Sequence, residues 1–307
     1  MEPSRRLNVI FLFSIVSFIV GTSTVEGIVI DGFETETNDR FSNDSSFIAN
    51  DFNLSGVALS DNGRWVTMIS PNVYISSEHF RPGSGQNVTF YASNDPNGPT
   101  VTRTTTATQE RVGDSDIWIG TIDSPLSSSF AYYNFATQNT TNNQTVPVLQ
   151  DDESFINSPY FEATAFHFGR SPTSWSISQD IAVGQNVIDH WFGEFSAANT
   201  TGEIAFGSTV DEEGDGNYVA FESFWEIGDS GSPVLVEDNG ELVLVGTGWF
   251  TTGNPDRNGF AYIGNYTEEI ETFLEAHSIP EPSTYAVLLG FATFGLVLYR
   301  RRCRHAA

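Results

Sequence analysis

The chain has 307 residues, with 39 Asp and Glu against 13 basic residues and a formal net charge of −26 at pH 7. Every basic residue is arginine, and six of the 13 lie in the two terminal segments. The acidic body repels nucleic-acid phosphate, which excludes a nucleic-acid partner, and its charge suits solubility in a salty environment.

Residues 1–27 have the composition of a secretory signal peptide. Two arginines precede the apolar run Leu7–Val20, and small and polar residues follow it. The run is too short and wrongly flanked for a spanning helix. Cleavage after Ser23 or after Gly27 satisfies the small-residue rule. We therefore expect export, with an N-terminal membrane anchor as the alternative.

The body, residues 28–279, has the composition of an extracellular all-β protein. Its apolar runs are short, and its length suits one large β domain or two small barrels. Residues 138–150 are rich in Asn, Thr and Gln and predict a linker between units at 28–137 and 151–279. The expected strands are Ser55–Leu59, Trp65–Ser70, Val73–Ser77, Asn87–Ala92, Ile117–Ile122, Ala131–Ala136, Tyr160–His167, Asn186–Ile188, Glu203–Phe206, Tyr218–Ser223, Val234–Glu237, Leu242–Gly246 and Gly259–Ile263.

Two residues suited to proton transfer lie at strand ends in the first unit. His79 follows the strand Val73–Ser77, and Asp116 precedes the strand Ile117–Ile122. A buried aspartate can accept the N–H of a histidine and fix its tautomer. Taken singly, a loop histidine and a turn aspartate are the ordinary structural alternatives.

An acidic segment follows in the second unit. Asp211, Glu213, Asp215, Gly216 and Glu222 fall at positions 1, 3, 5, 6 and 12 of a calcium loop of the EF-hand kind. Position 3 is usually Asp or Asn, and the flanks predict strands, not helices. The sequence favours a solvated hairpin turn over a calcium site, and with it melting that is independent of calcium.

The segment Gly228–Pro233 reads Gly-Asp-Ser-Gly-Ser-Pro. A serine in such a turn can project its hydroxyl while nearby backbone N–H groups converge on one point, as an acyl-transfer nucleophile with an oxyanion hole requires. Ser230 is therefore the candidate nucleophile. An α/β-hydrolase elbow would need Gly in place of Ser232 and a strand–helix alternation, so that fold is disfavoured.

A helix is predicted from Asn265, with Glu268 completing a capping box, to about His277. Its apolar residues Ile270, Phe273 and Leu274 fall on one face.

Residues 280–307 form a separate tail. The tripeptide Pro280–Pro282 precedes an apolar run, Tyr285–Tyr299, whose length is near the minimum for a transmembrane helix, and an arginine cluster follows. This order resembles the PEP-CTERM sorting tail of Gram-negative bacteria. The resemblance implies an inner-membrane-anchored precursor, processing by an exosortase partner, and release to the cell surface or extracellular matrix. A plain C-terminal anchor is the alternative. The only cysteine, Cys303, lies in this tail, so the body has no disulfide and no catalytic thiol.

Three segments together resemble the chymotrypsin/trypsin-like serine proteases. The strand into His79 resembles ISP-x-x-VLTAAHC, with Ser-Ser-Glu-His-Phe in place of Thr-Ala-Ala-His-Cys. Asp116–Leu126 resembles DIALLKLxxPV, and Gly228–Pro233 resembles GDSGGP with Ser232 for the second glycine. The order matches the family's, and the likeness covers residues 50–277.

The resemblance implies two six-stranded antiparallel β-barrels with a closing helix, and a serine endopeptidase that acts on protein or peptide substrates without a cofactor. It assigns Ser230 as nucleophile, His79 as general base and acid, and Asp116 as the group that orients His79. It also assigns the oxyanion hole to the backbone N–H groups of Gly228 and Ser230.

Activation and specificity follow from the same resemblance. The family's counterpart of Asp229 pairs with a newly exposed α-amino group, and Ile28 lies at one predicted cleavage site, although Ile30 and Asp31 depart from the family's Ile-Val-Gly-Gly. A mobile N-terminal arm is the alternative.

The expected pocket residues are Phe224, Trp225, Gly248 and Trp249, with Glu226 and Phe250 beside them. No aspartate stands where it would favour Arg or Lys, which predicts an apolar or small side chain at the cleavage position.

The competing hypothesis is a non-catalytic matrix or adhesive protein that retains this fold. An acidic body with a sorting tail suits that role, whereas the intact set of three candidate residues favours the enzyme.

Overall fold

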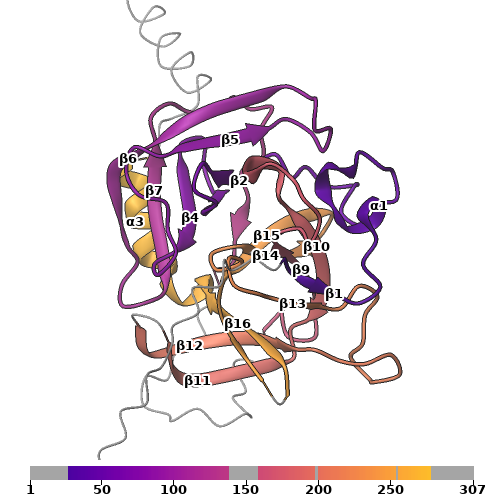
Figure 1. Ribbon diagram of the computed structural model, residues 1–307. Coiled ribbons are helices and arrows are strands. Elements are labelled where there is room, and N and C mark those ends of the chain that lie inside the picture. The colour runs from indigo at the N-terminus through magenta and orange to yellow at the C-terminus, as the bar shows by residue number, and fades with distance from the viewer. Residues whose placement is uncertain (1–26, 138–157, 198–199, 254, 278–307) are drawn as a thin grey trace, which may run out of the picture.

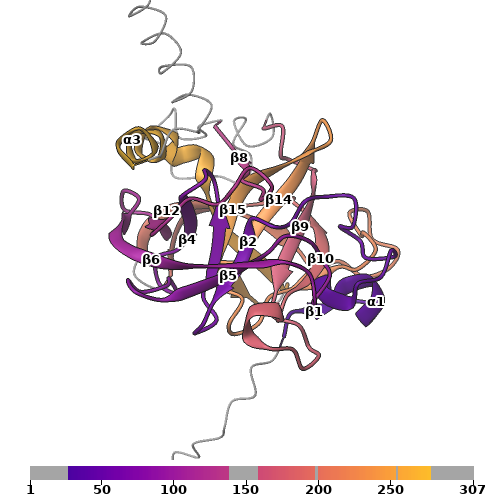
Figure 2. The same ribbon diagram turned by 90° about the horizontal axis from the view of Figure 1, so that it is seen from above.

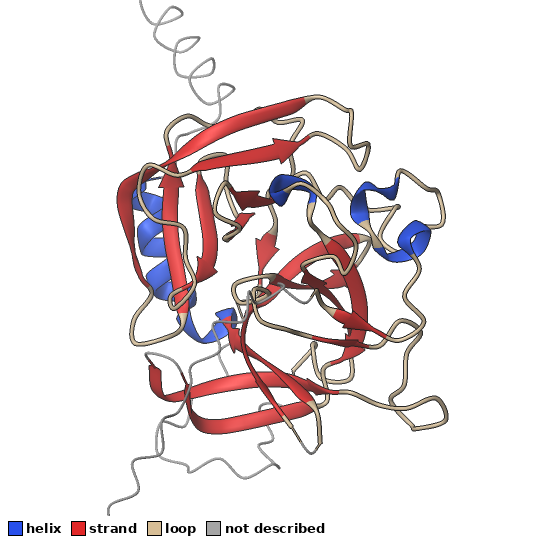
Figure 3. Cartoon of the chain, in the orientation of Figure 1, coloured by secondary structure: helices blue, strands red, loops and turns tan. Residues whose placement is uncertain are grey.

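The computed structural model describes residues 27–137, 158–197, 200–253 and 255–277, which are mostly β structure (Figures 1 and 3). The first half contains β1 (Val29–Ile30), α1 (Thr35–Asn38), the 3₁₀ helix η1 (Arg40–Ser42), β2 (Val57–Ser60), β3 (Trp65–Met68), β4 (Val73–Ser77), β5 (Asn87–Tyr91), β6 (Thr100–Arg111), β7 (Ile117–Ile122) and β8 (Asn134–Phe135). The second half contains β9 (Thr164–Gly169), η2 (Ile177–Gln179), β10 (Ala182–Val187), β11 (His190–Ala197), β12 (Thr200–Thr209), β13 (Ser223–Phe224), β14 (Pro233–Asp238), β15 (Glu241–Thr252), β16 (Arg257–Tyr262), η3 (Ile263–Tyr266) and α3 (Thr267–His277).

Several predicted segments lie outside the described residues. These are residues 1–26 of the signal peptide, the linker 138–150 and the sorting tail 280–307. Among the helices that are described, none combines the length and the apolar character needed to cross a bilayer.

The first half forms a closed antiparallel barrel in the order β2-β3-β4-β7-β6-β5. Every residue of β2, β3 and β4 is buried, and β4 and β7 have the bounds that the sequence predicts. The long strand β6 was not predicted, because its Thr, Gln, Arg and Glu side chains form no apolar run. Pairing with β5 on one side and β7 on the other holds it in place.

The second half forms an eight-stranded sheet in the order β10-β9-β14-β15-β16-β12-β11, with β8 added in parallel to β15. The described strands follow an open path, which differs from the closed second barrel that the family resemblance implies. The predicted strand Tyr218–Ser223 is also wrong, because only β13 forms there and it pairs with β1. Ala131–Ala136 is reduced to β8, which crosses to the second half. Figure 2 shows this sheet beside the barrel.

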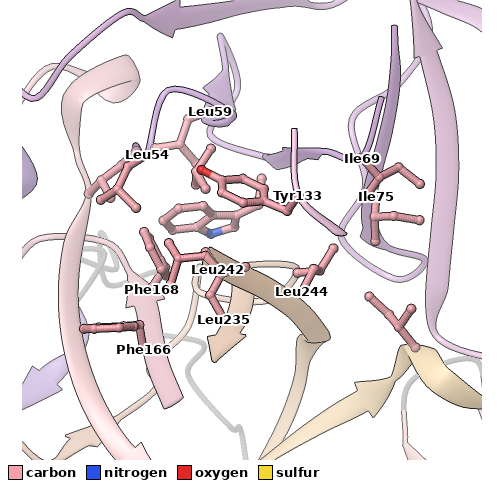
Figure 4. Packing of buried hydrophobic residues seen from close by; sticks show 14 of the residues in the cluster. Leu54, Leu59, Ile69, Ile75, Tyr133, Phe166, Phe168, Leu235, Leu242 and Leu244 are labelled. Carbon is pink, nitrogen blue, oxygen red and sulfur yellow. The ribbon is translucent and has the colours of Figure 1, made fainter. Parts of the chain in front are cut away.

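The largest apolar cluster joins the two halves. Leu59 and Ile75 from the barrel pack in the same cluster as Phe168, Leu235 and Leu244 from the sheet (Figure 4). All five side chains are fully excluded from solvent. This shared core fixes one half against the other, and the candidate active site lies along their junction.

The predicted C-terminal helix is confirmed, with a correction to its start. The 3₁₀ helix η3 precedes it, so α3 begins at Thr267 and Asn265 does not cap it. Ile270 and Phe273 are buried, as their spacing predicts. At the other end, Asn72 Nδ2 donates to the carbonyl oxygen of His277 at 2.9 Å, which attaches the helix to the barrel.

Candidate active site

Strand pairing places His79 beside Asp116. In the antiparallel pair of β4 and β7, Ser77 lies opposite Ile117. The Glu78 N–H then donates to the carbonyl oxygen of Asp116 at 2.7 Å. His79, just past the end of β4, therefore lies beside Asp116, just before β7, although the two are 37 positions apart.

The two side chains form a close pair. His79 Nδ1 lies 2.7 Å from Asp116 Oδ2 and 2.9 Å from Oδ1, and the His79 backbone N–H donates to Oδ1 at 3.1 Å. An ionised carboxylate only accepts hydrogen bonds, so Nδ1 carries the proton and Nε2 is left as the basic nitrogen. The Asp116 side chain is fully buried and that of His79 is 18% exposed. Burial raises the pKa of Asp116, and the hydrogen bonds from His79 oppose that rise.

Ser230 stands in a tight turn between β13 and β14. The turn needs glycine at two positions, because Gly228 and Gly231 have φ values of +110° and +86°. The Gly231 N–H donates to the carbonyl oxygen of Gly248 at 2.8 Å, and Trp65 Nε1 donates to that of Gly228 at 3.2 Å. These contacts fix the turn to the sheet on one side and to the barrel on the other.

The turn also packs directly on the strand that leads to His79. A Cβ added to Gly231 would lie 2.8 Å from Ser77 Oγ and 3.1 Å from the Ser77 nitrogen. The turn that carries Ser230 therefore lies against the strand end that leads to His79. Within residues 27–137 and 200–253, which contain these side chains, no hydrogen bond joins Ser230 Oγ to His79. Such bonds are often long in unliganded sites and shorten when substrate binds.

The backbone around Ser230 offers unused donors. Asp229 and Gly231 donate their N–H groups to Glu226 and Gly248. Within the described chain, the N–H groups of Gly228 and Ser230 have no such acceptor. These are the two groups predicted for an oxyanion hole, and they stand on either side of Asp229.

A cavity of about 180 Å³ opens next to Ser230. It is lined by Trp225, Glu226, Ile227, Ser230, Gly248, Trp249, Phe250 and Thr251. Trp225, Gly248 and Trp249 thus lie where predicted, whereas Phe224 is not among the lining residues and pairs with Val29 instead. Ile227, which sequence reasoning missed, is 84% exposed at the rim. A lone Ile gives no signal in the sequence that would mark it as part of a pocket.

Ile28 and Asp229 share one buried space. A Cβ on Gly169 would lie 2.5 Å from Ile28 Cβ and 2.9 Å from Asp229 Cγ, so glycine is required there. The Ile28 N–H donates to the carbonyl oxygen of Arg170, whose own N–H donates to Asp229 Oδ1. Burial raises the pKa of Asp229 to about 7. The predicted mobile arm is therefore wrong for Ile28, which is buried.

In the acidic loop at residues 211–222, carboxylates of the loop accept hydrogen bonds from the loop's own backbone N–H groups. Glu222 is buried, and its two carboxyl oxygens accept the N–H groups of Asp211 at 3.2 Å and Val219 at 3.3 Å. Asp215 accepts the N–H of Glu212. In the part of the chain that the structure describes, no group of three or more His, Cys, Asp or Glu side chains is arranged to hold a metal ion. Calcium-independent melting stays a prediction.

Sequence reasoning also missed Glu203, a buried residue of β12 whose Oε2 accepts the backbone N–H of Asp116 at 2.9 Å. The available signal was an ionisable residue at the start of the short apolar run Ile204–Phe206. With this geometry established, comparison with known proteins adds no assignment: no protein-family model matches the chain, and no curated protein matches it.

Proposed function

We propose that this protein is an exported serine endopeptidase of the trypsin-like class. In this proposal Ser230 attacks the scissile carbonyl, His79 accepts its proton and later donates it to the leaving amine, and Asp116 stabilises the imidazolium. The backbone N–H groups of Gly228 and Ser230 bind the oxyanion. The sheet of the second half is then an opened relative of the family's second barrel.

One observation carries the proposal. Two residues chosen for their chemistry, His79 and Asp116, are in contact, and the turn that carries the third, Ser230, packs on the strand that leads to His79. The buried carboxylate of Asp116 contacts Nδ1 of His79 just beyond the end of β4, and the serine turn packs on that same strand. The ordinary structural roles of a loop histidine and a turn aspartate do not require this hydrogen-bonded pair.

A fluorophosphonate probe tests the proposal directly. The exported protein is expected to be labelled on Ser230, because the probe reacts only with a serine activated by a base. Peptide mapping by mass spectrometry identifies the labelled residue. Ser232→Ala is the matched control, since it removes the neighbouring hydroxyl and should still be labelled. An unlabelled native protein would leave the matrix or adhesive role as the better hypothesis.

Cleavage specificity provides a second prediction. The lining of the cavity beside Ser230 includes three aromatic side chains, those of Trp225, Trp249 and Phe250. We expect kcat/KM to be at least about 10-fold higher for chromogenic peptides with an apolar residue at the cleavage position than for the matched Arg peptide, because differences of 1–3 kcal/mol are usual for such pockets. Preferred hydrolysis of the Arg peptide would instead assign a binding role to Glu226.

A further inference from the structure

Strand β12 of the second half reaches across to the barrel loop that carries Asp116. Arg111 Nη2 donates to Thr200 Oγ1 at 3.2 Å, and the Asp116 backbone N–H donates to Glu203 Oε2 at 2.9 Å. Thr200 and Glu203 are both buried. The second half therefore provides the candidate nucleophile Ser230 and also a hydrogen-bond acceptor for the backbone of Asp116.

Within the barrel, this loop is held through Arg111, Ser115 and the Asp116 carbonyl oxygen, which accepts the Glu78 N–H. Arg111 Nε donates to the carbonyl oxygen of Ser115, and Ser115 Oγ donates to that of Val112, each at 2.6 Å. The Asp116 N–H lies beyond these contacts and has Glu203 as its acceptor. The Glu78 N–H holds the Asp116 carbonyl oxygen and the His79 N–H holds Asp116 Oδ1, while the bond to Glu203 fixes the Asp116 N–H from the second half.

The surroundings of Glu203 favour a neutral acid. Asp116, Arg111 and Tyr266 face it from the loop before β7, from β6 and from η3. Burial raises the pKa of Glu203 to about 8, while the Asp116 N–H and Arg111 lower it. The raised pKa favours the protonated form of Glu203, which accepts the N–H without placing a second negative charge beside Asp116.

We infer that Glu203 is a positioning residue for the candidate triad, holding the Asp116 backbone so that its carboxylate meets His79. This inference rests on the proposed function for its kinetic consequences, whereas the geometry it predicts can be measured in an inactive protein.

Glu203→Ala and Glu203→Gln test it at pH 7 in the full exported chain. The alanine variant removes the acceptor, and we expect kcat to fall roughly 10- to 100-fold with KM nearly unchanged, because displacements of about 1 Å at a catalytic group cost this much. The glutamine variant keeps an uncharged acceptor of the same length and should retain most of kcat. Thr200→Val is the matched control. It removes the other contact between β12 and this loop, and should lower the melting temperature without lowering kcat.

A second measurement does not need activity. In a Ser230→Ala background, proton NMR reports the downfield Nδ1–H resonance of the His79–Asp116 hydrogen bond and the pKa of His79. We expect Glu203→Ala to shift or broaden that resonance and Glu203→Gln to leave it in place. An unchanged resonance in the alanine variant, or equal loss of kcat in the alanine, glutamine and Thr200→Val variants, would overturn the inference. Failure of native Ser230 to react with the fluorophosphonate would instead overturn the protease proposal.

Discussion

Replacing Asp116 with asparagine is expected to lower kcat about 10⁴-fold while the protein still folds. The amide has nearly the same shape, but its NH₂ group cannot accept the His79 Nδ1 proton that Asp116 Oδ2 now accepts at 2.7 Å. The imidazole then prefers the tautomer with the proton on Nε2, so that nitrogen can no longer act as the proposed base. Steady-state hydrolysis of an apolar chromogenic peptide measures the effect.

Asp114→Asn is the control for this substitution. Asp114 lies two residues away on the same loop and is exposed, so its loss of charge should leave kcat nearly unchanged. Circular dichroism and the melting temperature establish that both variants fold. A kcat for Asp116→Asn within about 10-fold of the native value would contradict the assigned role.

Blocking the α-amino group of Ile28 is expected to lower kcat about 10²- to 10³-fold. If export leaves Ile28 as the first residue, its ammonium lies in the same space as the buried Asp229 carboxylate. Removing one partner of such a buried pair costs about 3–5 kcal/mol, and the loss destabilises the turn that contains Asp229 and Ser230. The chain contains no lysine, so the terminal amine is the only primary amine that an acylating reagent can reach.

This chemistry allows a matched comparison. Acetylation removes the positive charge, whereas reductive methylation keeps it, so only acetylation should lower kcat to this extent. Because Ile28 is buried, either reaction requires unfolding and refolding. N-terminal sequencing comes first, and a mature chain that begins anywhere other than Ile28 would rule out this mode of activation.

The same pairing predicts a pH dependence of stability. Without the ammonium, the folded chain keeps a proton on Asp229 up to its pKa of about 7, whereas the unfolded chain releases it near pH 4. The folded state therefore binds more protons between these values, and the free energy of unfolding falls as pH rises through that window. An ammonium at Ile28 lowers the pKa of Asp229 and removes this loss. Urea unfolding of the acetylated and methylated forms between pH 4 and 7 measures the difference.

Local pattern was informative where a strand is buried on both faces or a residue has distinctive chemistry. The apolar segments of β4 and β7 have their predicted bounds, and His79 and Asp116 stand where those strands end. Strand β6 was missed because its mostly polar residues give no apolar pattern, although its pairing with β5 and β7 makes it part of the barrel. The open sheet of the second half also escaped prediction, since strand order depends on pairing between distant segments.

The amino-acid sequence by itself determined which chemical groups this protein has: one serine in a glycine-bracketed turn, a histidine and an aspartate at strand ends, an acidic body and no lysine. Only the tertiary structure decided which of these groups meet. Asp116 and Glu203 are 87 positions apart, and Gly231 packs on Ser77 across the junction of the two halves. The register of β4 with β7 and the core shared by both halves create these contacts, and neither is encoded in the local periodicity of any single segment.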